Sequence, residues 1–150
     1  MQIAFRPSTP NDVDFARIVH HEAYREVIIR QFGTFNVDKQ NNFFESDAKD
    51  IAAGKFLIIL ADQIACGYTC LERQDSHYKL RELVISPCYQ GQKIGQTVLE
   101  KHIAAANSQH LPIQLSVLLE NKARNLYSRN GFAVISKNDT HFLMDRPFAG

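Results

Sequence analysis

The sequence predicts a mixed α/β domain with a mainly antiparallel sheet of about seven strands flanked by about four helices. Short β-rich runs alternate with longer segments in which apolar residues recur at helical spacing. One helical segment, which starts near residue 91, joins the strand-like runs at 79–86 and 113–118. Such a β-α-β crossover is expected to be parallel and right-handed, whereas the short connections elsewhere favour antiparallel hairpins.

The chain is expected to begin with a short strand at 3–6 and a helix from about 10 to about 30. Thr9 is a suitable N-cap, and Pro10 fits the first helical position. Apolar residues then recur at helical spacing until the helix breaks at Gly33.

A second helix over 39–53 is expected to be capped by Asp38 and to close at Gly54. The later elements follow from β-rich runs, helical stripes and Gly or Pro breaks. They are strands at 56–61, 64–72 and 79–86, a helix from 91 that ends before Pro112, a strand at 113–118, a helix at 122–131, and strands at 132–136 and 141–144. The order is β α α β β β α β α β β.

Length and charge limit the function classes. A chain of 150 residues with 45% hydrophobic residues can build one core, so we expect a single domain over 1–150. The net charge of +1, from 17 basic and 16 acidic side chains, argues against a nucleic acid or an anionic membrane as partner. Residues 1–78 carry 8 basic and 11 acidic side chains, and 79–150 carry 9 and 5, so an anionic ligand is expected in the second half.

The cysteines and histidines predict neither disulfides nor a metal site. No secretory signal or membrane span is apparent, and we expect a cytoplasmic protein with Cys66, Cys70 and Cys88 as reduced thiols. His20 and His21 point about 100° apart on a helix and form no metal-binding face, so we interpret them as surface or boundary residues.

The segment 83–99 is the most informative part of the sequence. A strand, a tight turn and a helix that opens with QGQKIG place several backbone N–H groups together, an arrangement that binds phosphate. An ordinary strand-to-helix connection would look the same. The segment contains neither a P-loop nor a Rossmann fingerprint.

Together, LRELVISP and YQGQKIGQTVL resemble the acetyl-coenzyme A signature of the GNAT N-acetyltransferases. Gln90 fills its first position and Gly95 its last, but Lys93 replaces the central glycine. If that position needs a left-handed backbone, lysine costs roughly 1–2 kcal/mol. If it lies within the first helical turn, the cost is small, and the lysine adds a charge beside the phosphates.

A later segment resembles the second motif of the same family. ENKARNLYSRNGF, at 120–132, matches its spacing. The matching residues are Asn121, Ala123, Leu126, Tyr127, Gly131 and Phe132. The resemblance covers nearly the whole chain and implies the GNAT acyltransferase fold, acetyl-coenzyme A as co-substrate and no metal. It is also compatible with a homodimer.

The resemblance implies a role for each matching residue. Backbone groups of Leu83, Val84 and Ile85 would pair with the pantetheine arm, and Asn121 would bind near it. Tyr127 would protonate the departing thiolate, although it could instead be an aromatic anchor for a short helix. The turn after Gln90 would cradle the pyrophosphate through the N–H groups of Gly91, Gln92, Lys93, Ile94, Gly95 and Gln96.

The implied reaction also needs a proton acceptor. A lysine-like amine with a pKa near 10.4 is neutral in only about one molecule in a thousand near pH 7, a deficit of roughly 4 kcal/mol. Glu82, beside the expected thioester site, is the candidate, although it could be a solvent-facing strand carboxylate; His141 is a weaker alternative. Glu26, Arg30 and Phe35 are candidates for the acceptor pocket by position only.

The sequence therefore predicts transfer of an acetyl group to a primary amine of a small molecule, peptide or protein. The amine would attack directly in a ternary complex, without a covalent enzyme intermediate. The alternative is a non-catalytic acyl-coenzyme A sensor with the same fold, which the substitution by Lys93 keeps open.

Overall fold

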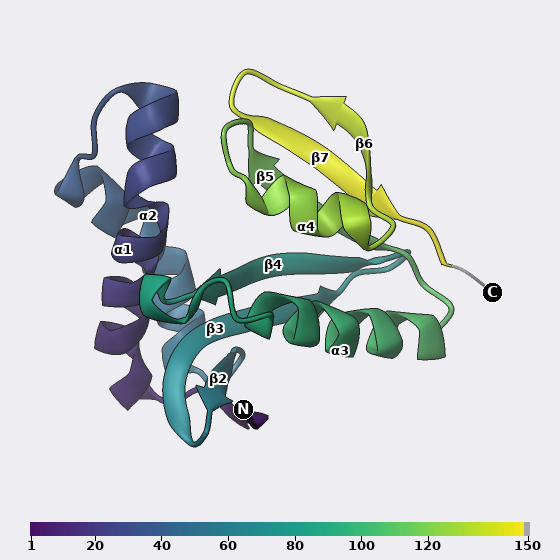
Figure 1. Cartoon of the computed structure of the whole chain (residues 1–150), viewed down its shortest axis with the longest axis horizontal. Coiled ribbons are helices and arrows are strands. Elements are labelled where there is room, and N and C mark those ends of the chain that lie inside the picture. The colour runs from purple at the N-terminus through teal and green to yellow at the C-terminus, as the bar shows by residue number, and fades with distance from the viewer. Residues whose placement is uncertain (149–150) are drawn as a thin grey trace. The chain divides into compact units, whose positions relative to one another are not determined.

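The computed structural model describes residues 1–148 and confirms the predicted order of elements (Figure 1). The strands are β1 (Ile3–Pro7), β2 (Leu57–Ala61), β3 (Ile64–Arg73), β4 (Tyr78–Ile85), β5 (Ile113–Leu118), β6 (Ala133–Lys137) and β7 (His141–Arg146). The helices are α1 (Val13–Phe32), α2 (Val37–Ala52), α3 (Ile94–Ser108) and α4 (Ala123–Arg129), with short 3-10 helices η1 (Pro10–Asp12) and η2 (Pro87–Tyr89).

The strands form the predicted mixed sheet, hydrogen-bonded in the order β1-β2-β3-β4-β5-β7-β6. The pairs β1–β2, β2–β3, β5–β7 and β6–β7 are antiparallel. β4 and β5 are parallel, as the predicted crossover through α3 requires.

The chain packs into two compact units. The first unit consists of Met1–Cys70 and Glu82–Gly95, and the second of Leu71–Arg81 and Gln96–Gly150. Strands β3 and β4 and helix α3 each contribute residues to both units. None of the helices within residues 1–148 combines the length and the apolar character that crossing a bilayer requires.

The core of the first unit lies between α1, α2 and one face of strands β2 to β4. The members of this core are Ala16 and Val19 from α1, Phe44, Ala48 and Ile51 from α2, Phe56 and Ile58 around β2, Tyr68 and Cys70 from β3, and Val84 from β4. Burial of each large apolar side chain among them contributes about 1.5–3 kcal/mol.

The start of α1 follows the sequence signal, and the start of α2 departs from it. Thr9 and Asp12 form a capping box that opens η1, which leads directly into α1. The predicted cap of α2, Asp38, is wrong: Asn36 is the N-cap, and its Oδ1 accepts a hydrogen bond from the Lys39 N–H at 2.9 Å. Asp38 lies inside the first turn, where its negative charge still suits the helix dipole.

The hairpin between β2 and β3 turns at the two residues that the sequence indicated. Asp62 and Gln63 have φ values of 49° and 71°. Two successive positive φ values are typical of the type I′ turn, whose twist matches that of paired strands.

The second unit has its own buried residues. On β5, Ile113, Leu115 and Val117 are buried, whereas Ser116 between them is exposed, as expected for a strand covered on one face. Val98 and Leu99 from α3 are fully buried. All residues of β6 are exposed, as is usual for a strand at the edge of a sheet.

Candidate functional site

The turn from β4 into α3 has a backbone that presents several N–H groups. Gly91 and Lys93 have positive φ values of 78° and 65°, and α3 begins at Ile94. Alternation of left- and right-handed residues directs successive N–H groups into one concavity, and the first N–H groups of a helix have no intrahelical acceptor. Gln90 holds the turn closed, because its Nε2 donates to the carbonyl oxygen of Ile85 at 3.0 Å.

The structure decides between the two conformations considered for Lys93. This residue is left-handed and immediately precedes α3, so it occupies a position that favours glycine. A lysine there carries strain of about 1–2 kcal/mol. Its side chain is exposed in the same turn as Gly91 and Gln92.

The later part of β4 is held on its β3 side by a close backbone approach. A Cβ atom at Gly67 on β3 would collide with the carbonyl oxygen of Val84. The Ser86 N–H also donates to the carbonyl oxygen of Cys66 at 2.8 Å. On the other side, Tyr78 and Lys79 at the start of β4 pair in parallel with Ile113 and Gln114 of β5.

Glu82 is half-buried on the face of β4 that points toward the helices. It lies two residues from Val84, a member of the core beneath α1 and α2, so both side chains are on one face. The hydroxyl of Tyr24 on α1 donates to Oε1 of Glu82 at 3.5 Å. Glu82 is therefore not a fully solvated strand carboxylate.

Tyr68 lies in the field of the same carboxylate. Its side chain is 0% exposed. Burial, and then the charges of Glu82, Tyr24 and Asp47, raises the pKa of Tyr68 well above its ordinary value. The first unit thus gathers two carboxylates and two phenols from α1, α2, β3 and β4.

The proposed acceptor residues lie on α1 and just after it. Glu26 and Arg30 form an ion pair with each other at 3.2 Å, and the Glu26 side chain is 84% exposed. Phe35 contacts the ring of His21 edge-on at 5.7 Å between centroids and lies under the Arg25 guanidinium.

The interpretation of both histidines as surface or boundary residues is wrong for His20, which is buried against Tyr24 and Phe44. Burial, and then the neighbouring His21, lowers the pKa of His20 to about 4, so its ring is neutral near pH 7. His21 is half-buried, and its Nε2 lies 2.7 Å from Oδ1 of Asn41.

Asn121 and Tyr127 belong to the second unit. Asn121 accepts a hydrogen bond from the Ala123 N–H at 2.9 Å and so helps to begin α4. Tyr127 is buried, with its ring 5.7 Å from that of Phe132. The Gln96 side chain exchanges two hydrogen bonds of 2.8 Å with Asn130, which links α3 to the end of α4.

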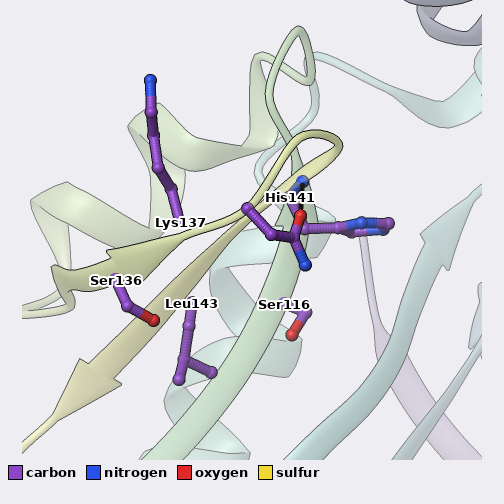
Figure 2. A pocket seen from close by; sticks show the side chains of 6 residues that line it. Ser116, Ser136, Lys137, His141 and Leu143 are labelled. Carbon is purple, nitrogen blue, oxygen red and sulfur yellow. Dashed lines mark hydrogen bonds between the residues drawn. The ribbon is translucent and has the colours of Figure 1, made fainter.

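His141 lies at a separate pocket of the second unit (Figure 2). Ser116, Leu143 and Ser136 form a row across β5, β7 and β6, and Lys137 points away from them (Figure 2). His141 Nδ1 lies 2.7 Å from the hydroxyl of Thr140, and burial lowers the pKa of His141. The pocket, about 210 Å³ in volume, is lined by Ser116, Ser136, Lys137, Asn138, His141 and Leu143.

A comparison with protein families matches the domain described as "Acetyltransferase (GNAT) domain" to residues 52–134, more than half of the chain. The chain belongs to the GNAT acetyltransferase family. It is therefore an N-acetyltransferase, and the family resemblance noted in the sequence is confirmed. None of the curated proteins matches the GNAT chain significantly.

Solved structures share the fold of this GNAT chain over almost its full length. PaiA N-acetyltransferase from Thermoplasma acidophilum, in complex with coenzyme A, is 20% identical over 99% of this chain and 100% of its own, with a TM-score of 0.81. A GCN5-related N-acetyltransferase from Rhodopseudomonas palustris is 15% identical over 98% and 96%, with a TM-score of 0.80. YjaB from Escherichia coli is 15% identical over 100% and 99%, with a TM-score of 0.73.

Three residues around Glu82 were not singled out from the sequence of this GNAT chain: Tyr24, Asp47 and Tyr68. The sequence contains one signal for Tyr68, because a tyrosine in a strand flanked by Cys66 and Cys70 is expected to face the core with them. Nothing in the sequence indicates that α1 and α2 bring Tyr24 and Asp47 to the same place.

Proposed function

We propose that this GNAT chain transfers the acetyl group of acetyl-coenzyme A to a primary amine by direct attack. The observation that carries the proposal is the continuous segment of the first unit from Glu82 to Gly95. It places a half-buried carboxylate, the end of strand β4 and a turn rich in N–H donors in succession. Residues 1–150 would act as one acyltransferase domain.

The residues of the turn fit a phosphate-rich co-substrate. The N–H groups of Gly91 to Gln96 would bind the pyrophosphate, and the Lys93 ammonium would add a positive charge beside it. The backbone of Leu83, Val84 and Ile85 would offer hydrogen-bonding groups to the pantetheine arm. Asn121 Nδ2 would donate near that arm, since Oδ1 already accepts from Ala123.

The chemistry requires that the nitrogen of the protonated amine lose two protons and that the thiolate gain one. Glu82 would accept the first proton, and the freed lone pair forms the new N–C bond as the C–S bond breaks. Tyr127 would give its proton to the departing thiolate, and the second proton lost by the nitrogen would restore the Tyr127 hydroxyl. The amine substrate would approach from the side of α1 and α2, where Glu82 meets Tyr24, and Glu26, Arg30 and Phe35 would shape the outer part of its path.

Three further expectations accompany the proposal. Cys66, Cys70 and Cys88 form no disulfide within residues 1–148, which supports the expectation of a reducing, cytoplasmic compartment. The cluster of Glu82 and Asp47 supports an acceptor that arrives as a cation. A homodimer is proposed from the family resemblance alone.

Calorimetry with acetyl-coenzyme A and a thiol-release assay over a panel of primary amines test the proposal. We expect binding of the co-substrate and thiol release that depends on the amine, with product mass increased by one acetyl group. Glu82→Gln should lower the rate and abolish the acid limb of the pH–rate profile, which is the fall of the rate at low pH. Binding of acetyl-coenzyme A without thiol release on any primary amine would overturn the proposed acceptor class.

A further inference from the structure

The hydroxyl of Tyr68 is buried and has no hydrogen-bond partner. Within residues 1–148, it is the one buried polar side-chain atom without a hydrogen-bond partner. An unpaired buried donor opposes folding, and folded proteins keep few of them. A phenylalanine would fill the same space without that cost, so the hydroxyl requires an explanation other than packing.

Core packing fixes the position of this hydroxyl. The Tyr68 ring lies 6.5 Å from the ring of Phe44 on α2 and 5.9 Å from that of Phe56, between centroids. Both neighbours are themselves buried. The ring is therefore held by rigid elements, and any hydrogen bond that its hydroxyl makes must form by movement of a neighbouring side chain.

Three polar side chains interact electrostatically with the Tyr68 hydroxyl: Tyr24 from α1, Asp47 from α2 and Glu82 from β4. Tyr24 already donates to Glu82, but at 3.5 Å, the long limit for such a bond. His20, which packs against the Tyr24 ring at 4.8 Å, is neutral near pH 7 and adds no charge.

We propose that Tyr68 is a positioning residue for Glu82, and that its hydroxyl donates a hydrogen bond to the Glu82 carboxylate when the acceptor amine is bound. Hydrogen bonds between catalytic groups are often long in a ligand-free enzyme and tighten in the complex with substrate. A carboxylate has about four acceptor positions, so the Glu82 side chain can accept from both Tyr24 and Tyr68. The inference rests on the proposed function, in which Glu82 accepts the amine proton.

Two consequences follow for the reaction. Two phenols, one from each side of the core, would fix the direction in which the carboxylate faces the amine, and a misplaced group of this kind lowers the rate by about 10-fold to 100-fold. A hydrogen bond donated to the charged carboxylate also lowers its pKa. Loss of that bond should move the acid limb of the rate to higher pH.

The test is Tyr68→Phe, assayed for the pH dependence of kcat with the amine that the panel identifies. We expect kcat to fall about 10-fold or more, the acid limb to move to higher pH, and the KM for acetyl-coenzyme A to stay unchanged. Because the variant removes an unsatisfied group and keeps the ring, its melting temperature should not fall. A purely structural Tyr68 would leave kcat and the acid limb unchanged, and that result would overturn the proposal.

Controls separate Tyr68 from Glu82. Tyr24→Phe should move the acid limb in the same direction, whereas Tyr78→Phe, the same change at a half-buried tyrosine of the second unit, should not move it. In a Glu82→Gln background, Tyr68→Phe should cause no further loss. If Glu82→Gln itself keeps the wild-type rate and profile, the base in the proposed function is wrong. If Glu82→Gln is impaired and Tyr68→Phe is not, only the role of Tyr68 is wrong.

Discussion

Gly67 on β3 passes so close to Val84 on β4 that no side chain fits between them. The Cβ of any other residue would collide with the Val84 carbonyl oxygen and would also lie 3.2 Å from Cα of Ile85. This contact fixes the strand segment whose backbone is proposed to bind the pantetheine arm. The glycine inside β3 is therefore required by the close approach of the neighbouring strand β4.

Gly67→Ala should therefore lower the free energy of unfolding by about 3 kcal/mol, because β4 must move to admit the methyl group. Chemical denaturation measures the loss. Gly33→Ala is the control for the same substitution without a steric clash. Gly33 has a φ of 86°, and a Cβ atom there would meet no atom within 4 Å. Its cost should be only the left-handed strain of about 1–2 kcal/mol, and equal losses in the two variants would contradict the steric explanation.

Lys93→Gly should raise the free energy of unfolding by about 0.5–1 kcal/mol, because it relieves left-handed strain at the cost of some unfolded-state entropy. Lys93→Gln removes the charge and keeps the strain. If the ammonium acts on the phosphates, both variants should bind coenzyme A a few-fold more weakly at low salt, and the difference from wild type should shrink at high salt. Calorimetry at two ionic strengths measures this, and unchanged affinity in Lys93→Gln would exclude the charge effect.

Tyr127→Phe should lower turnover by about 100-fold while coenzyme A affinity is retained, because only the proton for the departing thiolate is removed. The buried ring and its contact with Phe132 remain. Stopped-flow thiol release and calorimetry on the same sample separate the two effects. A variant with wild-type turnover across the pH range would show that Tyr127 is an aromatic anchor and nothing more.

Asp12→Asn should make the protein less stable at neutral pH, and the difference from wild type should vanish in acid. Two hydrogen bonds of 2.8 Å from Arg6, together with those from Thr9, lower the pKa of Asp12 to about 2. A carboxyl group with a depressed pKa stabilises the fold at pH values above its ordinary pKa of 3.8. This contribution is lost as the pH falls through about 2. The Asp12 side chain is 10% exposed but Arg6 is 41% exposed, so solvent screening limits the loss to about 1–2 kcal/mol.

Thermal unfolding from pH 7 to pH 2 tests this prediction. Asp75→Asn provides the control, since Asp75 is exposed in the turn before β4. It should change stability by no more than about 0.5 kcal/mol at any pH. A constant difference between Asp12→Asn and wild type across the whole range would mean that the carboxylate charge is not the source of the stability.

The candidate site was predictable where its signals are local. The turn from β4 into α3 and the Asn121 to Phe132 segment were apparent from spacing, because the chemistry of a turn or a short helix depends on adjacent residues. The cap of α2 shows the limit of such signals: Asn36 and Asp38 are both good capping residues, and the entry of the chain into the helix selected Asn36.

The sequence by itself determined the order of strands and helices, the family and the position of Glu82 on β4. Tertiary structure decided what surrounds that carboxylate. Tyr24 and Glu82 are 58 residues apart, and Tyr68 reaches the same place from a third element. Periodicity assigns each of these residues to a face of its own element, but only the packing of α1 and α2 on the sheet determines which faces meet. The left-handed backbone of Lys93 was settled in the same way, since the sequence allowed either conformation and the fold adopted the strained one.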